Sequence, residues 1–355
     1  MSPRSQARLA SAVLQLLVDG VDPLLSDAQW DDGVVVLERN AVLLRVADRL
    51  HALGRSLPPA MAAAAVQARA RAERVLQLMR RAADACERHG IPYVFPKGLP
   101  HYPDVGGDVD LLVPRSTNVD PLIVEGLGAT LQGPGVSHAV SGSRVYHLAG
   151  PPPVLDLDIQ HGRVGRLGEH PELAARLVQN RRSVFVGGVA WWVPALEDAL
   201  VLQGLDRLAG RRSFRIADVV STIKALQGGL DWDGVRGAAS AAGVLPGVSC
   251  YLSYVSQIHR EALGRELALP PLGVPRAAGW GRAEFERGAF HFPTVRVNGE
   301  LYARAFGSAV ARGRWFGVGR LLLLPLIAVT ALVRRGVRAL AAGVLQPAPL
   351  HRGKS

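Results

Sequence analysis

Hydrophobic positions in the first quarter of the chain recur at helical spacing. Residues 5–18 and 41–53 show this spacing, and residues 59–88 predict a long helix rich in Ala and Arg. That helix is expected to end at His89-Gly90, because glycine is a common stop signal at a helix C-terminus. Residues 1–88 are therefore predicted to form a helical N-terminal region.

The pattern then changes to short apolar runs that are typical of strands. Strands are predicted at residues 91–95, 109–113, 144–148 and 154–159. Residues 120–131 predict a short helix between them. Two further runs, at 184–186 and 190–193, flank a Gly-Gly pair, which is typical of a β-hairpin. Residues 89–194 are therefore predicted to form a small α/β core.

Helical spacing returns after Pro194. Helices joined by short loops are predicted at residues 195–208, 214–227, 231–242 and 245–264. Three prolines within residues 270–275 mark a boundary. We expect a helical domain at 195–268 and an irregular basic tail at 269–355. The predicted fold class is α/β, of the α+β kind: a small mixed-sheet core with a helical N-terminal lead and a helical C-terminal domain.

Composition narrows the class of protein. Of the 355 residues, 48% are hydrophobic and 20% are charged, which supports a packed core and excludes a wholly disordered chain. The two cysteines exclude a disulfide scaffold and an all-cysteine metal site. No signal-peptide layout and no run of eighteen apolar residues stands in the sequence. We therefore expect a cytoplasmic protein.

The net charge of +11 is concentrated at the C-terminal end. Residues 276–355 hold thirteen Arg or Lys and three Glu, a balance of +10. Within them, the apolar segment 321–333 is too short to span a bilayer, and Pro325 would kink it. Its basic and aromatic flanks favour a peripheral helix on an anionic membrane surface. A helix packed on the body is an equal alternative, and binding to nucleic acid ranks lower because no array of stacking aromatics is present.

Four acidic residues carry the most specific chemical signal. Asp108 and Asp110 lie two apart in a predicted strand, so both carboxylates point to one face. Like charges at this spacing repel unless a cation lies between them, and oxygen ligands of this kind suit Mg²⁺ or Mn²⁺. Asp156 and Asp158 share a face of a later strand and supply a third acid. The plainer alternative is that these acids face solvent at strand ends.

Lys97-Gly98 follows the first predicted strand of the core. Glycine lets the backbone approach a phosphate closely, and the lysine adds a compact positive charge. Acids that bind metal ions, together with a phosphate-binding turn, suit phosphoryl transfer. The plainer alternative is an ordinary turn between a strand and a loop.

The order of these features resembles the nucleotidyltransferase superfamily that includes polymerase beta. Its hallmark is a strand that ends in a glycine turn, a loop, an Asp-hydrophobic-Asp/Glu pair and a third acid on a later strand. More narrowly, the chain resembles the uncharacterised nucleotidyltransferase group with a Lys-Gly turn, over roughly residues 75–260. The matching segments are Ile91–Val94, Lys97-Gly98, Gly107–Val113, Val193-Pro194, Glu197-Asp198, Arg215–Asp218 and Leu230–Asp233.

The resemblance implies an activity and a role for each acid. Asp108 and Asp110 would bind two Mg²⁺ ions, with Asp158 as the third acid and Asp156 as its alternative. Asp158 is preferred because the polar pair Gln160-His161 follows it, much as a polar/aromatic pair does in relatives. Lys97 and Gly98 would hold the triphosphate of an NTP such as ATP. The reaction would then move a nucleoside monophosphate to an unknown acceptor and release pyrophosphate.

The sequence also departs from the superfamily pattern. Leu99 stands where relatives have a serine that helps to hold phosphate. The loop before Asp108 contains no arginine, and His101 is its only possible cation. An active transferase stays the leading hypothesis. These departures motivate the alternative of a catalytically degenerate member that binds a nucleotide or a partner and that could lie at a membrane surface. Asp218 is expected to be structural, and Glu197 and Asp198 to be first-turn acids of a helix.

Overall fold

The computed structural model describes residues 1–133, 141–148, 155–166, 168–210, 213–273 and 276–323. The chain divides into two compact units, Met1–Ala305 and Phe306–Ser355. The predicted boundaries after residues 88, 194 and 268 all fall inside the first unit, which contains every candidate site residue.

Four helices form the N-terminal region. They are α1 (Pro3–Leu14, continued by a π-helical turn, Gln15–Asp19), α2 (Asp27–Arg39), α3 (Leu43–Ala52) and α4 (Pro59–Arg88). The three predicted helices are confirmed, and α2 is additional. It begins at a capping box, in which the Ser26 hydroxyl accepts from the Gln29 amide and the Gln29 side chain accepts from the Ser26 amide.

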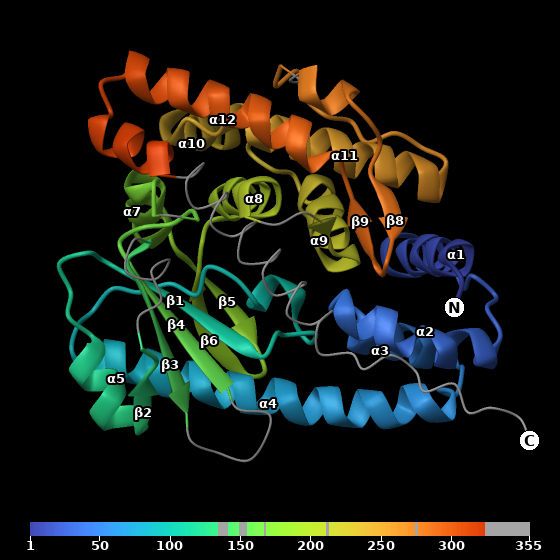
Figure 1. The fold of residues 1–355 in the computed structure, drawn as a ribbon. Helices are drawn as coiled ribbons and strands as arrows, with labels where there is room; N and C mark the ends of the chain where they lie inside the picture. Colours follow the sequence, from blue (N-terminus) through green and yellow to red (C-terminus); the bar gives the residue numbers. More distant parts are fainter. Residues whose placement is uncertain (134–140, 149–154, 167, 211–212, 274–275, 324–355) are drawn as a thin grey trace, which may run out of the picture. The chain divides into compact units, whose positions relative to one another are not determined.

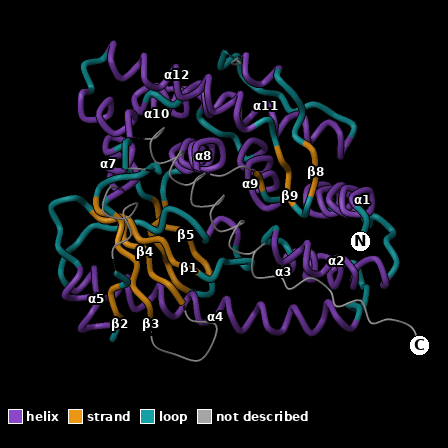
Figure 2. Tube along the Cα trace, in the orientation of Figure 1, coloured by secondary structure: helices purple, strands orange, loops and turns teal. Residues whose placement is uncertain are grey.

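The central sheet is mixed, which confirms the predicted fold class. Its strands are β1 (Asp108–Val113), β2 (Ala129–Leu131), β3 (Ser143–Leu148) and β4 (Leu155–His161), in the order β1-β4-β3-β2. Only β1 and β4 run parallel. Helix α4 lies along one face of this sheet (Figures 1 and 2). The segment predicted as one helix at 120–131 divides into α5 (Asp120–Leu127) and β2.

Alternation along β1 sends the acids away from α4. Val109, Leu111 and Val113 are buried in the cluster that includes α4, so Asp108 and Asp110 point to the opposite face. The sheet therefore carries an apolar face against α4 and an acidic face toward the helices that follow it.

The strand predicted at 91–95 is wrong. Only Val94 pairs with β1, through two backbone hydrogen bonds to Leu112, and the next amide, that of Phe95, donates to Trp192. Because the segment bonds to two different partners in turn, it forms no continuous ladder. Its apolar run reflects burial, since Tyr93, Val94 and Phe95 are all enclosed.

The predicted hairpin is confirmed as β5 (Arg182–Val186) and β6 (Val189–Val193). Val186 pairs with Val189 across the turn. Gly187 and Gly188 have φ values of +59° and +77°. Such a turn needs positive φ at both central residues, which explains the two glycines.

The four helices predicted after Pro194 are confirmed. They are α8 (Leu196–Leu205, continued by a π-helical turn, Asp206–Gly210), α9 (Ile216–Gln227), α10 (Trp232–Ala242) and α11 (Leu245–Leu263), and the unpredicted α7 (Pro171–Gln179) precedes them. Among the described residues, no helix combines the length and apolar character that crossing a membrane requires.

The prediction of an irregular tail is wrong for residues 284–311. These form β8 (Glu284–Glu286), β9 (Ala289–His291) and α12 (Thr294–Ala311). Strand β9 pairs with β7 (Ser213–Phe214), and the ring of Phe292 stacks on that of Phe214 with centroids 5.0 Å apart. Strands of two or three residues are too short to show a period. Of the apolar segment 321–333, residues 324–333 lie outside the described residues, so the membrane and nucleic-acid interpretations of the tail stay predictions.

The turn between β8 and β9 also ties the ends of the first unit together. The side chain of Asn40, which is fully buried, donates to the carbonyl of Gly288 at 2.9 Å and accepts from the amide of Ile216 at 2.9 Å. The Gly288 amide donates to the side chain of Gln6 at 3.0 Å. Helices α1 and α2, the start of α9 and the C-terminal hairpin therefore meet at one point.

Replacing Phe292 by Ala is expected to lower the free energy of unfolding by ~3–5 kcal/mol, because the ring is 6% exposed and packs on Phe214 and Tyr254. Phe185 is the matched control, since its ring is 77% exposed; Phe185→Ala is expected to stay within about 0.5 kcal/mol of the wild type. Urea unfolding of the full chain measures both. Equal stability of the two variants would contradict the placement of residue 292 in the core.

Candidate functional site

The acidic face of the sheet brings four carboxylates into two cross-strand pairs. Parallel pairing of β1 with β4 sets Asp108 opposite Asp156 and Asp110 opposite Asp158. Directly opposed residues on adjacent strands point to the same face, so all four side chains share it. The two Asp-x-Asp segments of the sequence therefore form one acidic surface in the folded protein.

Asp158 occupies the least favourable position for a negative charge. Its Oδ1 atom is buried and accepts no hydrogen bond. Burial raises the pKa of Asp158 to about 7, and the charges of Asp110 and Asp108 add to that rise, while Lys97 opposes it. A positive charge placed beside these carboxylates would therefore stabilise the ionised form.

Asp156 lies in a different environment. Its Oδ1 atom is 2.5 Å from Nδ1 of His147, the residue opposite it on β3, and its side chain is 42% exposed. Alternation along β4 does not distinguish Asp156 from Asp158, because both point to the same face. Their neighbours do distinguish them. Asp158 faces Asp110 and Lys97, and Asp156 faces a histidine.

The Lys97-Gly98 turn lies beside the acids. Lys97 Nζ is 3.4 Å from Asp206 Oδ1 and 3.9 Å from Asp110 Oδ1. Gly98 has a φ of +89°, which favours glycine, and a Cβ placed on it would have no atom within 4 Å. The backbone at Gly98 therefore presents an open side.

A pocket of about 260 Å³ separates the acids from the helices. Lys97, Gly98, Asp108 and Asp110 line its sheet side. Its other wall comes from the hairpin and from α8 and α9, and includes three arginines: Arg182, Arg207 and Arg215. The two acids of β1 and the turn that the sequence singled out therefore share one concave site, whose other wall holds Asp206 as well as the three arginines.

A buried ion pair fixes the wall of this pocket. Arg207 Nε lies 2.8 Å from Asp218 Oδ2, and neither side chain is more than 8% exposed. The other Asp218 oxygen lies 3.4 Å from His101 Nε2, in the loop between Gly98 and Asp108. Burial would raise the pKa of Asp218, but the His101 hydrogen bond and the Arg207 charge lower it to about 2. The structural role predicted for Asp218 is thereby confirmed.

The same loop is also fastened to α3. Asp104 accepts hydrogen bonds from the backbone amides of Leu44 and Arg45, and its Oδ2 lies 3.1 Å from Arg45 Nε. Asp104 therefore caps the start of α3. Two residues therefore hold the loop between Lys97 and Asp108 in place: His101 contacts Asp218 on α9, and Asp104 binds the start of α3.

Other sequence expectations near the site can now be compared with their contacts. Glu197 and Asp198 lie in the first turn of α8, as predicted. Asp198 is fully buried, and its Oδ1 lies 2.6 Å from Arg176 Nε. Leu99 is buried in the core beneath the sheet, so this position offers no polar group to the pocket.

Several site residues carry no sequence signal. Asp206 contacts Lys97 from 109 positions further along the chain, and Arg207 contacts Asp206. Gln160 Nε2 donates to Asp110 Oδ1 at 3.0 Å. The only hint in the sequence was the polar pair after Asp158, of which Gln160 is the first member. Tertiary contacts, not neighbouring positions in the sequence, place Asp206, Arg207 and Gln160 at the site.

No group of three or more His, Cys, Asp or Glu side chains in the described part of the chain is arranged to hold a metal ion. Asp110 is turned toward Gln160 and Lys97, and Asp156 toward His147. The four carboxylates are neighbours, but Asp110 and Asp156 each accept a hydrogen bond from another side chain, so their oxygens do not converge on one point.

The sequence matches one family profile, described as an uncharacterised nucleotidyltransferase, over residues 26–259. The match begins at α2 and ends in α11, so it includes the pocket and both of its walls. It starts earlier than the resemblance seen from residue 75 onward, and it leaves out β8, β9 and α12. No curated protein and no solved structure matches the chain.

Replacing Asp158 by Asn is expected to stabilise the protein at pH 8 in EDTA. Because the folded-state pKa is raised from 3.8 to about 7, ionisation destabilises the fold as pH rises through this interval. The gain at pH 8 has an upper limit of ~4 kcal/mol and disappears near pH 4. Thermal unfolding across this pH range measures it. Asp156→Asn is the control, and the same pH-dependent gain in it would contradict the assignment.

Asp218→Asn is expected to lose about 2 kcal/mol of stability at pH 7. The pKa of Asp218 is lowered from 3.8 to about 2, so its contribution is complete above pH 4 and is lost as pH falls toward 2. The difference from the wild type should therefore shrink between pH 4 and pH 3 in urea unfolding. Asp233→Asn, at a side chain 89% exposed, should show no such difference; a gap for Asp218→Asn that is independent of pH would refute the argument.

Proposed function

The chain belongs to the uncharacterised nucleotidyltransferase family, and on that premise we propose that it transfers the nucleoside monophosphate of an NTP to an acceptor hydroxyl and releases pyrophosphate. The observation that carries the proposal is the position of Asp158. Its buried Oδ1 has no hydrogen-bond partner and lies on the same face as Asp108 and Asp110. Acids grouped in this way, beside a pocket that Lys97 and three arginines also line, suit phosphoryl chemistry.

The chemistry of the donor set suits a divalent cation, although the described side chains, as they now lie, form no metal site. The Oδ1 atom of Asp158 has no hydrogen-bond partner, and its pKa is raised first by burial and then by the charge of Asp110, so a cation beside it would stabilise the ionised carboxylate. Asp108, Asp110 and Asp158 would hold Mg²⁺ or Mn²⁺, with Asp156 as the alternative third ligand. When bound, such an ion neutralises charge on the phosphates and makes a coordinated hydroxyl more acidic. The contacts of Asp110 with Gln160 and Lys97 would be exchanged for it.

The pocket supplies the groups that would hold a triphosphate. The open backbone at Gly98 admits close approach of a phosphate oxygen. Lys97 sits between two carboxylates, from which its ammonium can turn to a phosphate without leaving the pocket. Arg182 and Arg215 on the opposite wall add positive charge to the lining.

Asp158 is placed to accept a proton. The acceptor hydroxyl oxygen forms a bond to the α-phosphorus, the bond from that phosphorus to the bridging oxygen breaks, and pyrophosphate leaves. The hydroxyl proton passes to Asp158 Oδ1, the oxygen that has no donor. Burial makes the Asp158 carboxylate a stronger base than an exposed one, which suits it to this step.

A second candidate function is nucleotide binding without transfer. Leu99 is buried and places no hydroxyl beside Gly98, and His101 is engaged by Asp218 instead of facing a phosphate. Lys97 is then the cation that the loop offers. Release of pyrophosphate from an NTP by the wild type, in the presence of candidate acceptors, separates the two functions.

Mg²⁺-dependent binding of an NTP is expected for the wild type and is expected to weaken more than about a hundredfold in the variant Asp108→Asn/Asp110→Asn. Calorimetry with each NTP as its α,β-methylene analogue, with Mg²⁺ and with EDTA, measures this. Asp158→Asn should weaken binding as well, whereas Asp156→Asn should bind like the wild type. Wild-type protein that binds no NTP, or that binds equally in EDTA, would reject the proposal.

A further inference from the structure

The second compact unit, Phe306–Ser355, carries a helix with large apolar side chains exposed to solvent. The helix covers residues 315–323 of the described chain. Four of its apolar side chains are between 40% and 70% exposed: Trp315, Phe316, Leu322 and Leu323. The two leucines follow the two aromatic residues by seven positions, and such positions point in nearly the same direction on a helix. The four side chains therefore form one apolar stripe.

A different side of the same helix is buried. Val318 is 8% exposed and Leu321 is 7% exposed. The helix therefore has two apolar sides, and the apolar stripe is the one that stays open to solvent. Single exposed apolar residues are common on proteins, but a contiguous group of them on one element marks a surface that binds a partner.

Basic residues accompany the apolar stripe. Residues 306–355 contain eight Arg or Lys and no Asp or Glu, a side-chain balance of +8 with His neutral. Arg312 and Arg314 come just before the helix. The guanidinium of Arg320 lies 4.5 Å from the centre of the Phe316 ring, which places a positive charge beside the stripe. The partner of this surface should therefore be both apolar and negatively charged.

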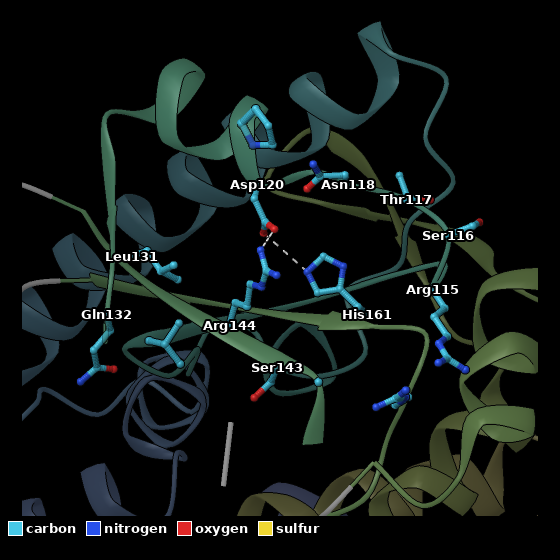
Figure 3. A pocket seen from close by; sticks show the side chains of 14 residues that line it. Arg115, Ser116, Thr117, Asn118, Asp120, Leu131, Gln132, Ser143, Arg144 and His161 are labelled. Carbon is cyan, nitrogen blue, oxygen red and sulfur yellow. Dashed lines mark ion pairs between the residues drawn. The ribbon is translucent and has the colours of Figure 1, made fainter. Parts of the chain in front are cut away.

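The first unit balances its arginines in another way. At a cavity of about 820 Å³, Asp120 forms an ion pair with Arg144, and its Oδ1 lies 3.6 Å from His161 Nε2 (Figure 3). Elsewhere in the same unit, Arg207 pairs with Asp218. The sequence of the second unit supplies no carboxylate side chain for pairs of this kind. A surface that offers many negative charges at once, such as a layer of anionic lipids, would balance its charge.

Other partners match the apolar stripe less well. A second copy of the chain would bring a further charge of +8 to the contact, and like charges repel. A nucleic acid would bind the arginines and stack its bases on the aromatic rings, but Leu322 and Leu323 would gain nothing from phosphates or base edges. The apolar run 321–333 is too short for a helix that crosses a bilayer. A lipid surface uses the aromatic rings, the leucines and the arginines together.

We infer that residues 312–323 bind the surface of an anionic lipid membrane. The apolar stripe enters the boundary between headgroups and acyl chains, and Arg312 and Arg314 bind lipid phosphates. The membrane-binding segment begins before the apolar run 321–333 that the sequence pattern indicates, because Trp315 and Phe316 belong to the stripe. Binding of this kind does not depend on the reaction proposed for the first unit.

The test measures binding of the full chain to large unilamellar vesicles by sedimentation. One set of vesicles is phosphatidylcholine alone, and the other is phosphatidylcholine with phosphatidylserine at about 3:1. The wild type is expected to bind the anionic vesicles at least about tenfold more tightly than the neutral ones. Added salt should reduce this preference, because it screens the attraction between the arginines and the lipids.

Two variants separate the apolar and the electrostatic contributions. Trp315→Gln/Phe316→Gln is expected to lose about tenfold or more in affinity for the anionic vesicles, since two large rings no longer enter the lipid. Arg312→Gln/Arg314→Gln is expected to lose a similar factor on the anionic vesicles and nothing on the neutral ones.

Fluorescence locates the contact independently of the affinity. Phosphatidylcholine with brominated acyl chains, included in the anionic vesicles, quenches a tryptophan that enters the lipid. The wild type is expected to be quenched. Trp315→Phe is expected to bind nearly as tightly, because it keeps an apolar ring, but to lose most of the quenching. Trp30 and Trp191 of the first unit are at most 2% exposed and should not be quenched.

Matched controls exclude general effects of charge, hydrophobicity and folding. Phe185→Gln/Val295→Gln removes two apolar side chains of the first unit that are 77% and 88% exposed. Arg69→Gln/Arg236→Gln removes two positive charges from surface ion pairs on α4 and α10. Both controls should bind the anionic vesicles like the wild type. Thermal unfolding of every variant, measured alongside, should match that of the wild type, because surface substitutions change stability little.

Four results would overturn the inference. They are absence of binding to anionic vesicles by the wild type, unchanged binding by the aromatic variant, equal losses in the control variants, and undiminished quenching in Trp315→Phe. Other partners of the apolar stripe give patterns of their own, and each would overturn it as well. One is a dimer in analytical ultracentrifugation that the aromatic variant loses, without vesicle binding. The other is binding to single-stranded DNA without vesicle binding.

Discussion

Asp218 has no exposed surface, yet it carries a full negative charge, and the surroundings of the acids depend on how that charge is neutralised. An unpaired carboxylate at such depth would destabilise the fold severely. Arg207 approaches it from the turn after α8, His101 from the loop beside Gly98, and the Arg215 amide from the start of α9. The two carboxylate oxygens of Asp218 bind all three of these segments. The two walls of the pocket therefore cannot move apart without exposing the buried charge of Asp218.

The ion pair between Arg207 and Asp218 also helps to set the position of the Lys97 side chain. Arg207 reaches Asp206 as well, at 3.4 Å, and Asp206 in turn lies beside the lysine. A chain of alternating charges therefore runs from the buried Asp218 to Asp110 on the sheet. The position of a flexible side chain in the pocket is thus set by groups on two helices, and the acids of β1 meet a cation that is already in place.

Sequence patterns predict the fold and the acids well for one physical reason: both depend on local periodicity. Helical spacing located α4 and the helices from α8 to α11, and a Gly-Gly pair located the hairpin. Periodicity fails where an element is too short or changes partner, as in β9 and residues 91–95. It also leaves Asp156 and Asp158 equivalent, since only the contacts across strands distinguish them. Asp206 and Arg207 depend on tertiary contacts, which no local spacing encodes.

The hydrogen bonds of the Asn40 side chain have a consequence for folding during translation. Its partners lie at Ile216 and Gly288, and Gln6 reaches the same turn from the first helix. While the ribosome is still adding residues before 288, the nascent chain lacks the strand that pairs with β7 at Phe214, and the side-chain amide of Asn40 lacks one of its two acceptors, the carbonyl of Gly288. The first unit therefore closes only after residues 288–291 have been added, and its early helices must wait until then. Until then they depend on their own packing or on chaperones to stay out of aggregates.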